Sequence, residues 1–220
     1  MLVCEKPPCL CEGVLLCLHF TYKIMILSIL IPSIPSRLES HLIPLIRELE
    51  RQIEVGYPKK HYEILMLCDN KKRSIGAKRQ ALLNLAQGEY VTFLDDDDKP
   101  DENYLWYFVE HYMSNYDDLS DVFTFNQKVI LNGEEYALQF KHGHPTNDEL
   151  VKDGITIRPP WHVCFWRREV VQHCTFPDSN YGEDWAWAEQ ANKKAKYAHH
   201  INHEMMTYVY DSKVSEANPE

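Results

Sequence analysis

Residues 88–100, GEYVTFLDDDDKP, join a short apolar run to four consecutive aspartates. The run at 90–94 consists of β-branched, aromatic and aliphatic residues and lacks Gly and Pro, so it predicts a mostly buried strand. In α/β proteins, ligands bind beyond the carboxyl ends of strands, and these aspartates lie at such an end. The stretch therefore predicts a buried strand that ends in an acidic site.

The four aspartates at 95–98 also predict a bound divalent cation. Two unit charges about 4 Å apart interact by roughly 4 kcal/mol at an effective dielectric of about 20, so neighbouring carboxylates repel one another unless a cation intervenes. Hard oxygen donors suit Mg²⁺ or Mn²⁺, which keep positions open for substrate phosphates when only one or two carboxylates bind. The spacing does not fit a calcium loop, because no Gly occupies its sixth position. A solvated acidic cap on the following helix is the alternative.

Length and composition limit the class of protein. A chain of 220 residues suits one well-buried domain and is short for two. Its 45% hydrophobic residues, with 5 Trp, 13 Tyr and 8 Phe, predict a packed core with aromatic side chains left for a ligand site. The formal net charge of -10 argues against a general nucleic-acid binder, which needs a basic surface to displace counterions. We expect no nucleic-acid partner.

The first 24 residues differ from the rest of the chain. Cysteines crowd the first 17 residues, but they form neither a disulfide framework nor the paired C-x₂-C units of a zinc site, so the expected location is the reducing cytoplasm. The apolar runs at 14–20 and 24–31 are split by a Thr-Tyr-Lys sequence, and we expect no transmembrane span. Residues 1–24 are interpreted as an extension, either disordered or not native, before a domain at 25–212 and a frayed tail at 213–220.

Hydrophobic periodicity predicts a β-α-β unit before the acidic stretch. Continuous apolar runs at 25–31 and 62–68 predict strands, and an apolar stripe at 38–55 predicts the helix between them, so the two strands should be parallel. A loop is expected at 32–36, where two prolines stop the first strand. Asp69 follows the second strand just as Asp95 follows the later one.

A basic segment, residues 71–79, lies between these two acidic strand ends and contains five Lys or Arg in nine positions. Ser74 predicts the N-cap of a helix that ends at Gly88. A basic helix start with free N–H groups attracts phosphate by charge and by dipole. A solvated charged loop is the alternative. The buried face of this helix is expected to comprise Ala81, Leu82, Leu85 and Ala86.

Beyond the aspartates, the pattern predicts smaller elements. We expect helices at 100–114 and 167–171 and strands at 122–125, 161–166 and 207–210. The dipeptide Asn132-Gly133 is a strong type I′ turn signal, so the flanking segments 128–131 and 135–140 should form a hairpin. The polar segment 141–160 is expected to be a mobile loop that acts as a lid.

A second acidic motif, Glu183-Asp184, enters a predicted helix with Trp185 and Trp187 beside it. A helix N-terminus favours an ionised carboxylate by about 0.3–1 kcal/mol, so capping explains the two acids. Capping does not explain the tryptophans. Each can be part of the core, or its exposed face can serve as a platform for the C–H surface of a sugar.

Taken together, these stretches resemble the family-2 nucleotide-sugar glycosyltransferases of the GT-A fold, in particular their compact viral and bacterial versions. The resemblance spans about residues 25–212 and depends on five segments, which are ILIPSIPSR, the Asp after YEILMLC, SIGAKRQALLNLAQGEYVTFLDDDD, RREVV…FPDSNYGEDWAWA and TYVYDS. It implies an α/β, Rossmann-like fold with a mostly parallel sheet, flanking helices and a small antiparallel hairpin.

The resemblance also implies a nucleotide-sugar donor, for which a UDP-sugar is expected. Asp95 and Asp97 match the Asp-x-Asp pair that holds Mn²⁺ or Mg²⁺ against the diphosphate, although the four-Asp run leaves the register open between these two and Asp96/Asp98. Gln80 departs from the family pattern, which commonly has Asn there. The residues expected to bind the donor are Pro32, Ser33, Arg37, Asp69, Lys78, Arg79 and Asp96.

In the same family pattern, Asp184 matches the catalytic base that takes the proton of an acceptor hydroxyl, and one such carboxylate suffices for displacement with inversion. A hydrolase would need a carboxyl pair flanking the glycosidic bond. The expected acceptor is a glycan or glycoconjugate. The residues expected near it are Trp161, His162, Glu183, Trp185 and His203. His199 and His200, like His162 and His203, are candidates for an acceptor contact or a further metal ligand, although any single histidine more often has a structural or surface role.

Two other functions compete with this interpretation. A sugar-phosphate nucleotidylyltransferase has a related architecture but a Gly-rich opening, and the segment 29–37 contains no glycine. A non-catalytic module that binds nucleotide sugars without turnover is the second alternative.

Overall fold

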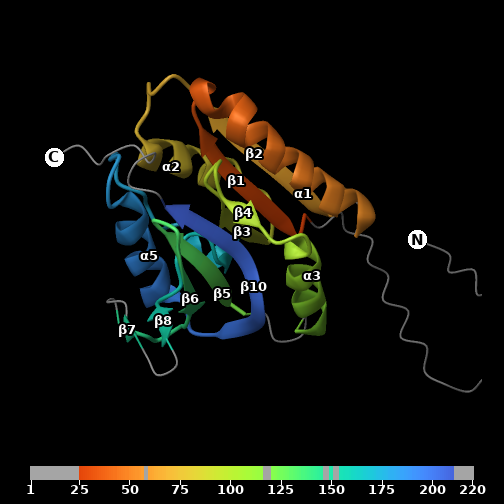
Figure 1. Ribbon diagram of the computed structural model, residues 1–220, viewed down its shortest axis with the longest axis vertical. Coiled ribbons are helices and arrows are strands. Elements are labelled where there is room, and N and C mark those ends of the chain that lie inside the picture. The colour runs from red at the N-terminus through yellow and green to blue at the C-terminus, as the bar shows by residue number, and fades with distance from the viewer. Residues whose placement is uncertain (1–24, 57–58, 116–119, 146–148, 151–153, 211–220) are drawn as a thin grey trace, which may run out of the picture.

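The computed structural model describes residues 25–56, 59–115, 120–145, 149–150 and 154–210. The expected extension at 1–24 and tail at 213–220 lie outside these residues. Helices flank a mixed sheet in an α/β arrangement (Figure 1), which confirms the expected fold class. The helical elements are η1 Pro35–Arg37, η2 Leu38–Leu42, α1 Ile43–Val55, η3 Lys59–His61, α2 Ile75–Leu85, α3 Tyr104–Ser114, α4 Arg168–Val171 and α5 Glu183–Lys194. The strands are β1 Leu27–Ser33, β2 Tyr62–Cys68, β3 Tyr90–Phe93, β4 Lys99–Pro100, β5 Val122–Leu131, β6 Glu134–Phe140, β7 Glu149–Leu150, β8 Ile155–Arg158, β9 Phe165–Arg167 and β10 Ala198–Tyr210.

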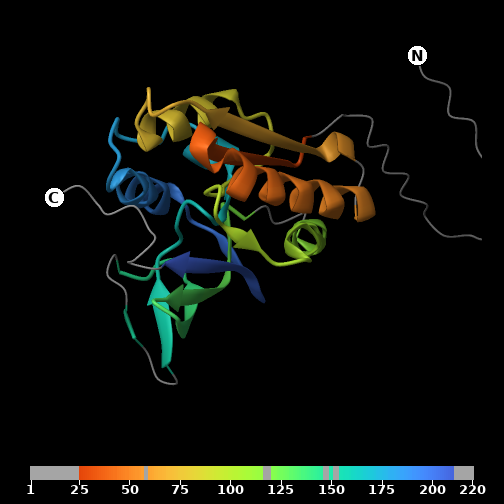
Figure 2. The ribbon, with the colours of Figure 1, turned by 45° about the horizontal axis from the view of Figure 1, so that its top comes forward.

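The N-terminal half is built around β1, whose seven residues are all buried. Strand β1 pairs in parallel with β2 on one side and with β3 on the other, as the sequence predicts for the first pair. Helices α1 and α2 lie on opposite faces of these strands (Figure 2), because right-handed crossovers lead outward to β2 and then back across β1 to β3. The reversal of direction leaves a crevice beyond the carboxyl ends of the strands, and this is where α/β proteins bind ligands.

The C-terminal half is more antiparallel than expected. Strand β9 joins β3 to β5, and both of its pairings are antiparallel. The predicted hairpin is present as β5 and β6, and the positive φ angles of Asn132 (51°) and Gly133 (88°) fit the predicted turn. The β5–β6 connection is a tight turn, which only antiparallel neighbours allow. The sheet is parallel around β1 and mixed beyond β3.

An aromatic cluster between β3 and α5 forms part of the hydrophobic core. Trp187 is fully buried and stacks on Phe176, with ring centroids 5.0 Å apart and planes 4° from parallel. Tyr90 and Phe93 of β3 also pack edge to face against aromatic neighbours. Such pairs contribute about 0.5–1.5 kcal/mol each beyond the burial of their area. Trp187 is therefore a core residue, whereas Trp185 lies at the surface.

Several predicted boundaries are wrong. Pro32 and Ser33 belong to β1, although the sequence predicts a loop there. Both residues lie beyond the last β1–β3 pair, so β1 has a neighbouring strand on one side only at this point. A proline is tolerated at such an edge position. Residues 161–164 form a turn, so that only the end of the predicted strand at 161–166 is extended. The predicted strand at 207–210 is the end of the much longer β10.

Other differences concern helices and the expected lid. Pro100 pairs with Met206 in β4, and α3 starts only at Tyr104. On α2, Leu83 is buried and Leu85 is exposed, because the packing of the helix on β1 selects which side faces inward. The segment 141–160 is not a plain loop, since β8 pairs with β6 and β7 pairs with β8. Among the described residues, no helix combines the length and apolar character needed to span a bilayer.

Candidate functional site

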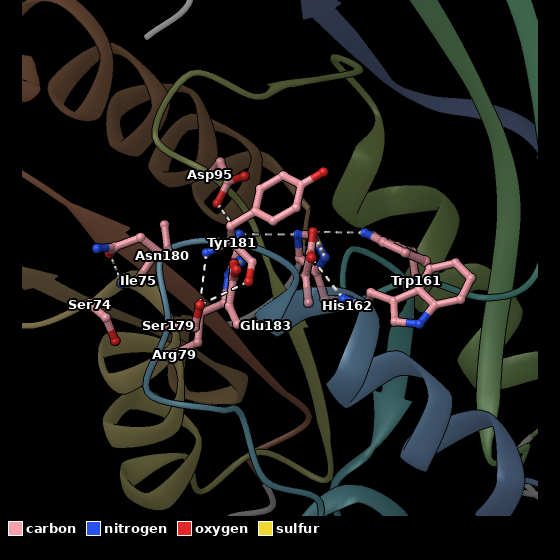
Figure 3. A network of polar contacts seen from close by, with 12 residues as sticks. Ser74, Ile75, Arg79, Asp95, Trp161, His162, Ser179, Asn180, Tyr181 and Glu183 are labelled. Atoms are coloured by element: carbon pink, nitrogen blue, oxygen red, sulfur yellow. Dashed lines mark hydrogen bonds and ion pairs between the residues drawn. The ribbon is translucent and has the colours of Figure 1, made fainter. Parts of the chain in front are cut away.

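The segment that leads into α5 is fixed against the first turn of α2. The backbone N–H of Ile75 donates to Asn180 Oδ1 at 3.0 Å, and that of Gly76 donates to the carbonyl of Ser179 at 3.0 Å (Figure 3). Ser74 is the predicted N-cap, since its Oγ accepts from Ala77 N at 3.0 Å. The N–H groups of this helix start are therefore used within the protein, and the prediction that they are free to bind phosphate is wrong.

The close approach of this segment to α2 requires a glycine at position 76. A Cβ atom placed on Gly76 would lie 1.9 Å from the carbonyl oxygen of Pro177 and 3.1 Å from Glu183 Cβ. Real Cβ atoms do not approach backbone this closely, so any side chain at 76 would displace the segment. Gly76 thus allows the start of α5, with Glu183 and Asp184, to sit beside α2.

Arg79 connects three distant parts of the chain. Its buried guanidinium donates from Nη2 to Asp95 Oδ1 at 2.6 Å and forms an ion pair through Nη1 with Glu183. Its Nη2 also lies 3.4 Å from His162 Nε2. Figure 3 shows these side chains converging from α2, the end of β3, the start of α5 and the turn before β9. Four residues expected to bind the donor, a metal or the acceptor are therefore one contiguous cluster, which we call the Arg79 cluster.

Asp184 adjoins the Arg79 cluster. Its Oδ2 accepts from Trp161 Nε1 at 3.2 Å and lies 3.9 Å from His162 Nδ1. Burial and the positive charge of Arg79 lower the pKa of His162 to about 4, so this imidazole is neutral near pH 7. A neutral histidine adds no positive charge beside Asp184, whose side chain is partly exposed. Asp184 is thus oriented by Trp161 and accessible to a ligand.

A second set of contacts links the ends of β1 and β2. The buried ammonium of Lys78 donates to the carbonyl of Ser33 at 2.7 Å and lies 2.9 Å from Asp69 Oδ1. Arg73 also pairs with Asp69, at 3.1 Å. Burial opposes the charge on Asp69, but the hydrogen bond and positive charge of Lys78 hold its pKa below the usual value. Pro32, also expected in the donor site, is buried within β1.

The four aspartates after β3 divide into two inward and two outward side chains. Asp96 is buried and accepts from Ser33 Oγ at 2.6 Å, and Asp98 is buried with its Oδ2 accepting from the backbone N–H of Asp95 at 2.8 Å. The side chains of Asp95 and Asp97 are 36% and 48% exposed. This alternation favours Asp95 and Asp97 as the pair able to reach a bound cation.

We call residues 95–98 the acidic turn. Its balance of acidic and basic side chains also fits a bound cation. Arg37 pairs with Asp96 at 3.0 Å and with Asp97, and Arg79 pairs with Asp95. Even so, burial and repulsion from Asp95 raise the pKa of Asp98 well above its usual value. Within the described part of the chain, no group of three or more His, Cys, Asp or Glu could hold a metal ion by itself. A cation here would need oxygen ligands from a substrate, which is how Mg²⁺ commonly binds.

The remaining histidines do not join the Arg79 cluster. His203 stacks on Tyr107 of α3, with ring centroids 4.0 Å apart, so the structure places it against that helix instead of in the expected acceptor site. His199 lies 2.8 Å from His111 of α3, and His200 lies 2.9 Å from Thr124 of β5. These contacts give His199 and His200 the structural role that is usual for a single histidine.

Two residues near the site were not anticipated. The guanidinium of Arg158 lies 5.3 Å from the centre of the Trp161 ring. Burial raises the pKa of Tyr208, and the negative charges of Asp95, Asp98 and Asp97 raise it further. Arg158 falls in a segment expected to be a loop, and the direction of Tyr208 depends on register shifts within β10. The sequence carries no local signal for the position of Arg158, and Tyr208 was noted only as part of the segment TYVYDS.

Replacing Arg79 with Met should destabilise the fold by about 3–5 kcal/mol, because the change leaves Glu183 and Asp95 without their buried counter-charge. Urea denaturation at neutral pH measures the loss. The matched control is Arg51→Met on α1, which removes a solvent-screened surface pair with Glu48 and should cost much less stability than Arg79→Met. Similar losses for both variants would contradict a special role for the Arg79 cluster.

Comparison with known proteins gives a family and a fold. The family model described as Glycosyl transferase family 2 matches residues 52–175, more than half of the chain. The crystal structure of S. aureus TarS 1-349 is similar at a TM-score of 0.62 and 16% identity over 84% of this chain and 60% of that one. The crystal structure of its complex with UDP has a TM-score of 0.65 and 17% identity, over 84% of this chain and 61% of that one. The complex with UDP-GlcNAc has a TM-score of 0.57 and 16% identity, over 84% of this chain and 59% of that one.

The present chain therefore spans about 60% of the length of TarS 1-349. At this level of identity the similarity establishes the fold, and it agrees with the GT-A architecture expected from the sequence. A search of the curated proteins found no match.

Proposed function

Because the chain belongs to glycosyl transferase family 2, we propose that it is a metal-dependent, inverting glycosyltransferase that moves a sugar from a UDP-sugar to an acceptor hydroxyl. The observation that carries the proposal is the position of Arg79, which joins Asp95 at the end of β3 to Glu183 at the start of α5. The acidic turn and Asp184 thereby face one another across a single arginine. The complexes of TarS with UDP and UDP-GlcNAc support the choice of donor.

In this proposal the nucleoside lies beyond the carboxyl ends of β1 and β2. Asp69 is held by Lys78 and Arg73, and it would accept hydrogen bonds from the nucleobase. Lys78 also holds the end of β1 through the carbonyl of Ser33. These contacts fix the donor pocket before a ligand arrives, which reduces the entropy cost of binding.

The transfer itself needs one proton acceptor. The acceptor oxygen forms a bond to the anomeric carbon, and the bond from that carbon to the diphosphate oxygen breaks, with its electron pair leaving on the diphosphate. Asp184 takes the proton of the attacking hydroxyl. Trp161 holds Asp184 through one carboxylate oxygen, so the base is oriented before the acceptor binds. Attack from the face opposite the leaving group inverts the anomeric configuration.

The acidic turn supplies the proposed metal site. Asp95 and Asp97 have the exposed carboxylates that would hold Mn²⁺ or Mg²⁺ together with the diphosphate oxygens. When bound, the cation acts as a Lewis acid that stabilises the charge developing on the diphosphate. Arg37 and Arg79 already partly neutralise these carboxylates and would keep the turn folded between turnovers.

A thermal-shift panel tests the donor site directly. Nucleoside diphosphates and nucleotide sugars are added with Mn²⁺, and UDP or a UDP-sugar should raise the free energy of unfolding by about 2.7 kcal/mol at 100 times its dissociation constant. The corresponding adenine and guanine nucleotides serve as controls for binding through the diphosphate alone. If no nucleotide raises the melting temperature, the proposed donor site is wrong.

A further inference from the structure

Strand β2 forms one end of the sheet. It pairs in parallel with β1 on its inner side, and no strand that the structure describes pairs with its outer side. An edge strand presents a row of N–H and C=O groups that can pair with another chain, and proteins usually protect it with a proline, a lysine or a bulge. The sequence of β2, YEILMLC, has no proline or lysine, and its register with β1 is uninterrupted. The outer side of β2 is therefore suited to accept a further strand.

A hollow of about 220 Å³ lies between β2 and α1. Its apolar lining comprises Ile46, Ile53, Tyr62, Ile64 and Met66. Strand β1 contributes no lining residue, so the hollow lies toward the outer edge of the sheet. Met66 is 52% exposed there, although methionine is one of the residues most often buried. An apolar hollow at a strand edge favours a partner strand that brings apolar side chains of its own.

The sequence of β2 is complementary to itself when two copies run antiparallel. Pairing centred on Leu65 places Ile64 of each copy opposite Met66 of the other, at the hollow. The one charged residue of the strand, Glu63, then lies opposite an apolar residue, so no like charges oppose each other. Glu63 is also held within its own chain, because its Oε1 accepts from the backbone N–H of Gln87 at 2.6 Å. The strand thus carries no charge that opposes the approach of a second copy.

The exposed charges of α1 are complementary in the same arrangement. Arg47, Glu50 and Glu54 are exposed and, at spacings of three and four residues, share one side of the helix. Helix α1 runs antiparallel to β2, since it connects two parallel strands, and the hollow places the middle of the helix level with the middle of β2. A two-fold axis at Leu65 reverses the helix of the second copy. Arg47 of each copy is thereby brought toward Glu50 of the other.

We propose that β2 is the interface of a symmetric dimer, in which two copies of this chain pair antiparallel through β2 and extend the sheet across both. A two-fold interface uses the same surface of both copies and must be complementary to itself, as the strand and the helix charges are here. The carboxyl ends of the two β2 strands point in opposite directions, so both proposed donor sites stay accessible. The inference does not depend on the proposed function.

Sedimentation velocity of the full chain over a range of concentrations tests the dimer. The native chain should sediment as a dimer, and Met66→Lys should raise the dissociation constant at least hundredfold, because each copy would bury a lysine against Ile64 of the other. The matched control is Met113→Lys on α3, where Met113 is 54% exposed. This control should leave the dissociation constant unchanged. Circular dichroism checks the fold of each variant.

Charge reversal provides a second test that leaves β2 intact. Arg47→Glu and Glu50→Arg should each raise the dissociation constant at least tenfold, because each places like charges opposite one another. The double variant should restore the native value, since the reversed charges are complementary again. A double variant that is no better than the single ones would contradict the proposed arrangement.

Hydrogen exchange locates the contact, since protection of the β2 amides should rise with protein concentration. A chain that stays monomeric at every concentration overturns the proposal, and protected β2 amides in that monomer would assign the edge to another segment of the same chain. A dimer that Met66→Lys leaves intact has its interface elsewhere and overturns the proposal as well. None of these outcomes bears on sugar transfer, so the dimer and the proposed function are tested separately.

Discussion

Replacing Asp184 with Asn is expected to lower the rate of sugar transfer by about 10²–10⁴-fold, the usual contribution of a general base, and to leave donor affinity unchanged. The amide has almost the same size, and its oxygen can still accept from Trp161 Nε1. It cannot take the proton of an acceptor hydroxyl. Single-turnover transfer and titration with the donor measure the two quantities separately.

Asp101→Asn provides the matched control for this substitution. Asp101 accepts from the backbone N–H of Asn103 before α3, outside the Arg79 cluster, and its change to Asn should leave transfer intact. If Asp184→Asn weakens donor binding and transfer equally, Asp184 has a structural role. If the native chain binds a UDP-sugar without any turnover, the alternative of a non-catalytic binding module is correct.

Removal of divalent metal by EDTA is expected to abolish transfer, and added Mn²⁺ or Mg²⁺ to restore it. Residues 95–98 carry four carboxyl groups, and the two arginines that pair with them are Arg37 and Arg79. A diphosphate would add further negative charge, so the complex should need a cation. The same dependence should appear in the binding of UDP, which calorimetry measures without any turnover.

Substitutions distinguish the two possible metal registers. Asp97→Asn should raise the Mn²⁺ concentration needed for half-maximal transfer, because Asp97 has an exposed carboxylate. Asp98→Asn should change it much less, because Asp98 points inward and accepts from Asp95 N. Undiminished activity in EDTA would reject the metal site, and the opposite ranking of the variants would reject the Asp95/Asp97 register.

The elements that the sequence predicts well are those with a local signal. Continuous apolar runs located β1, β2 and β3, a helical apolar stripe located α1, and Asn132-Gly133 located the β5–β6 hairpin. The order of these elements gave a β-α-β unit, and the resemblance to family 2 implied the GT-A fold. The pattern was less informative beyond β3, where β9 pairs antiparallel with strands far away in the sequence and register shifts interrupt the β10–β5 pairing.

In the candidate site, too, some features have a local signal in the sequence and others do not. The four aspartates and the Glu183-Asp184 pair were visible in the sequence as acidic groups at the end of a strand and the start of a helix. Their partners were not, since Arg79 and Glu183 are 104 residues apart. Arg158 lay in no motif, and Tyr208 lay in the segment TYVYDS without an assigned role, because the contacts of both residues depend on segments far away in the sequence.

By itself, the sequence determined the family, the strand that carries the acidic turn and the residue types available for chemistry, because these depend on local order along the chain. Only the tertiary structure decided that Asp95 and Asp97 face outward, that the N–H groups of α2 are occupied by the segment before α5, and that Trp187 is core while Trp185 lines a cavity. The physical reason is that the direction of a side chain and its choice of partner are set by register and packing between segments far apart in the sequence.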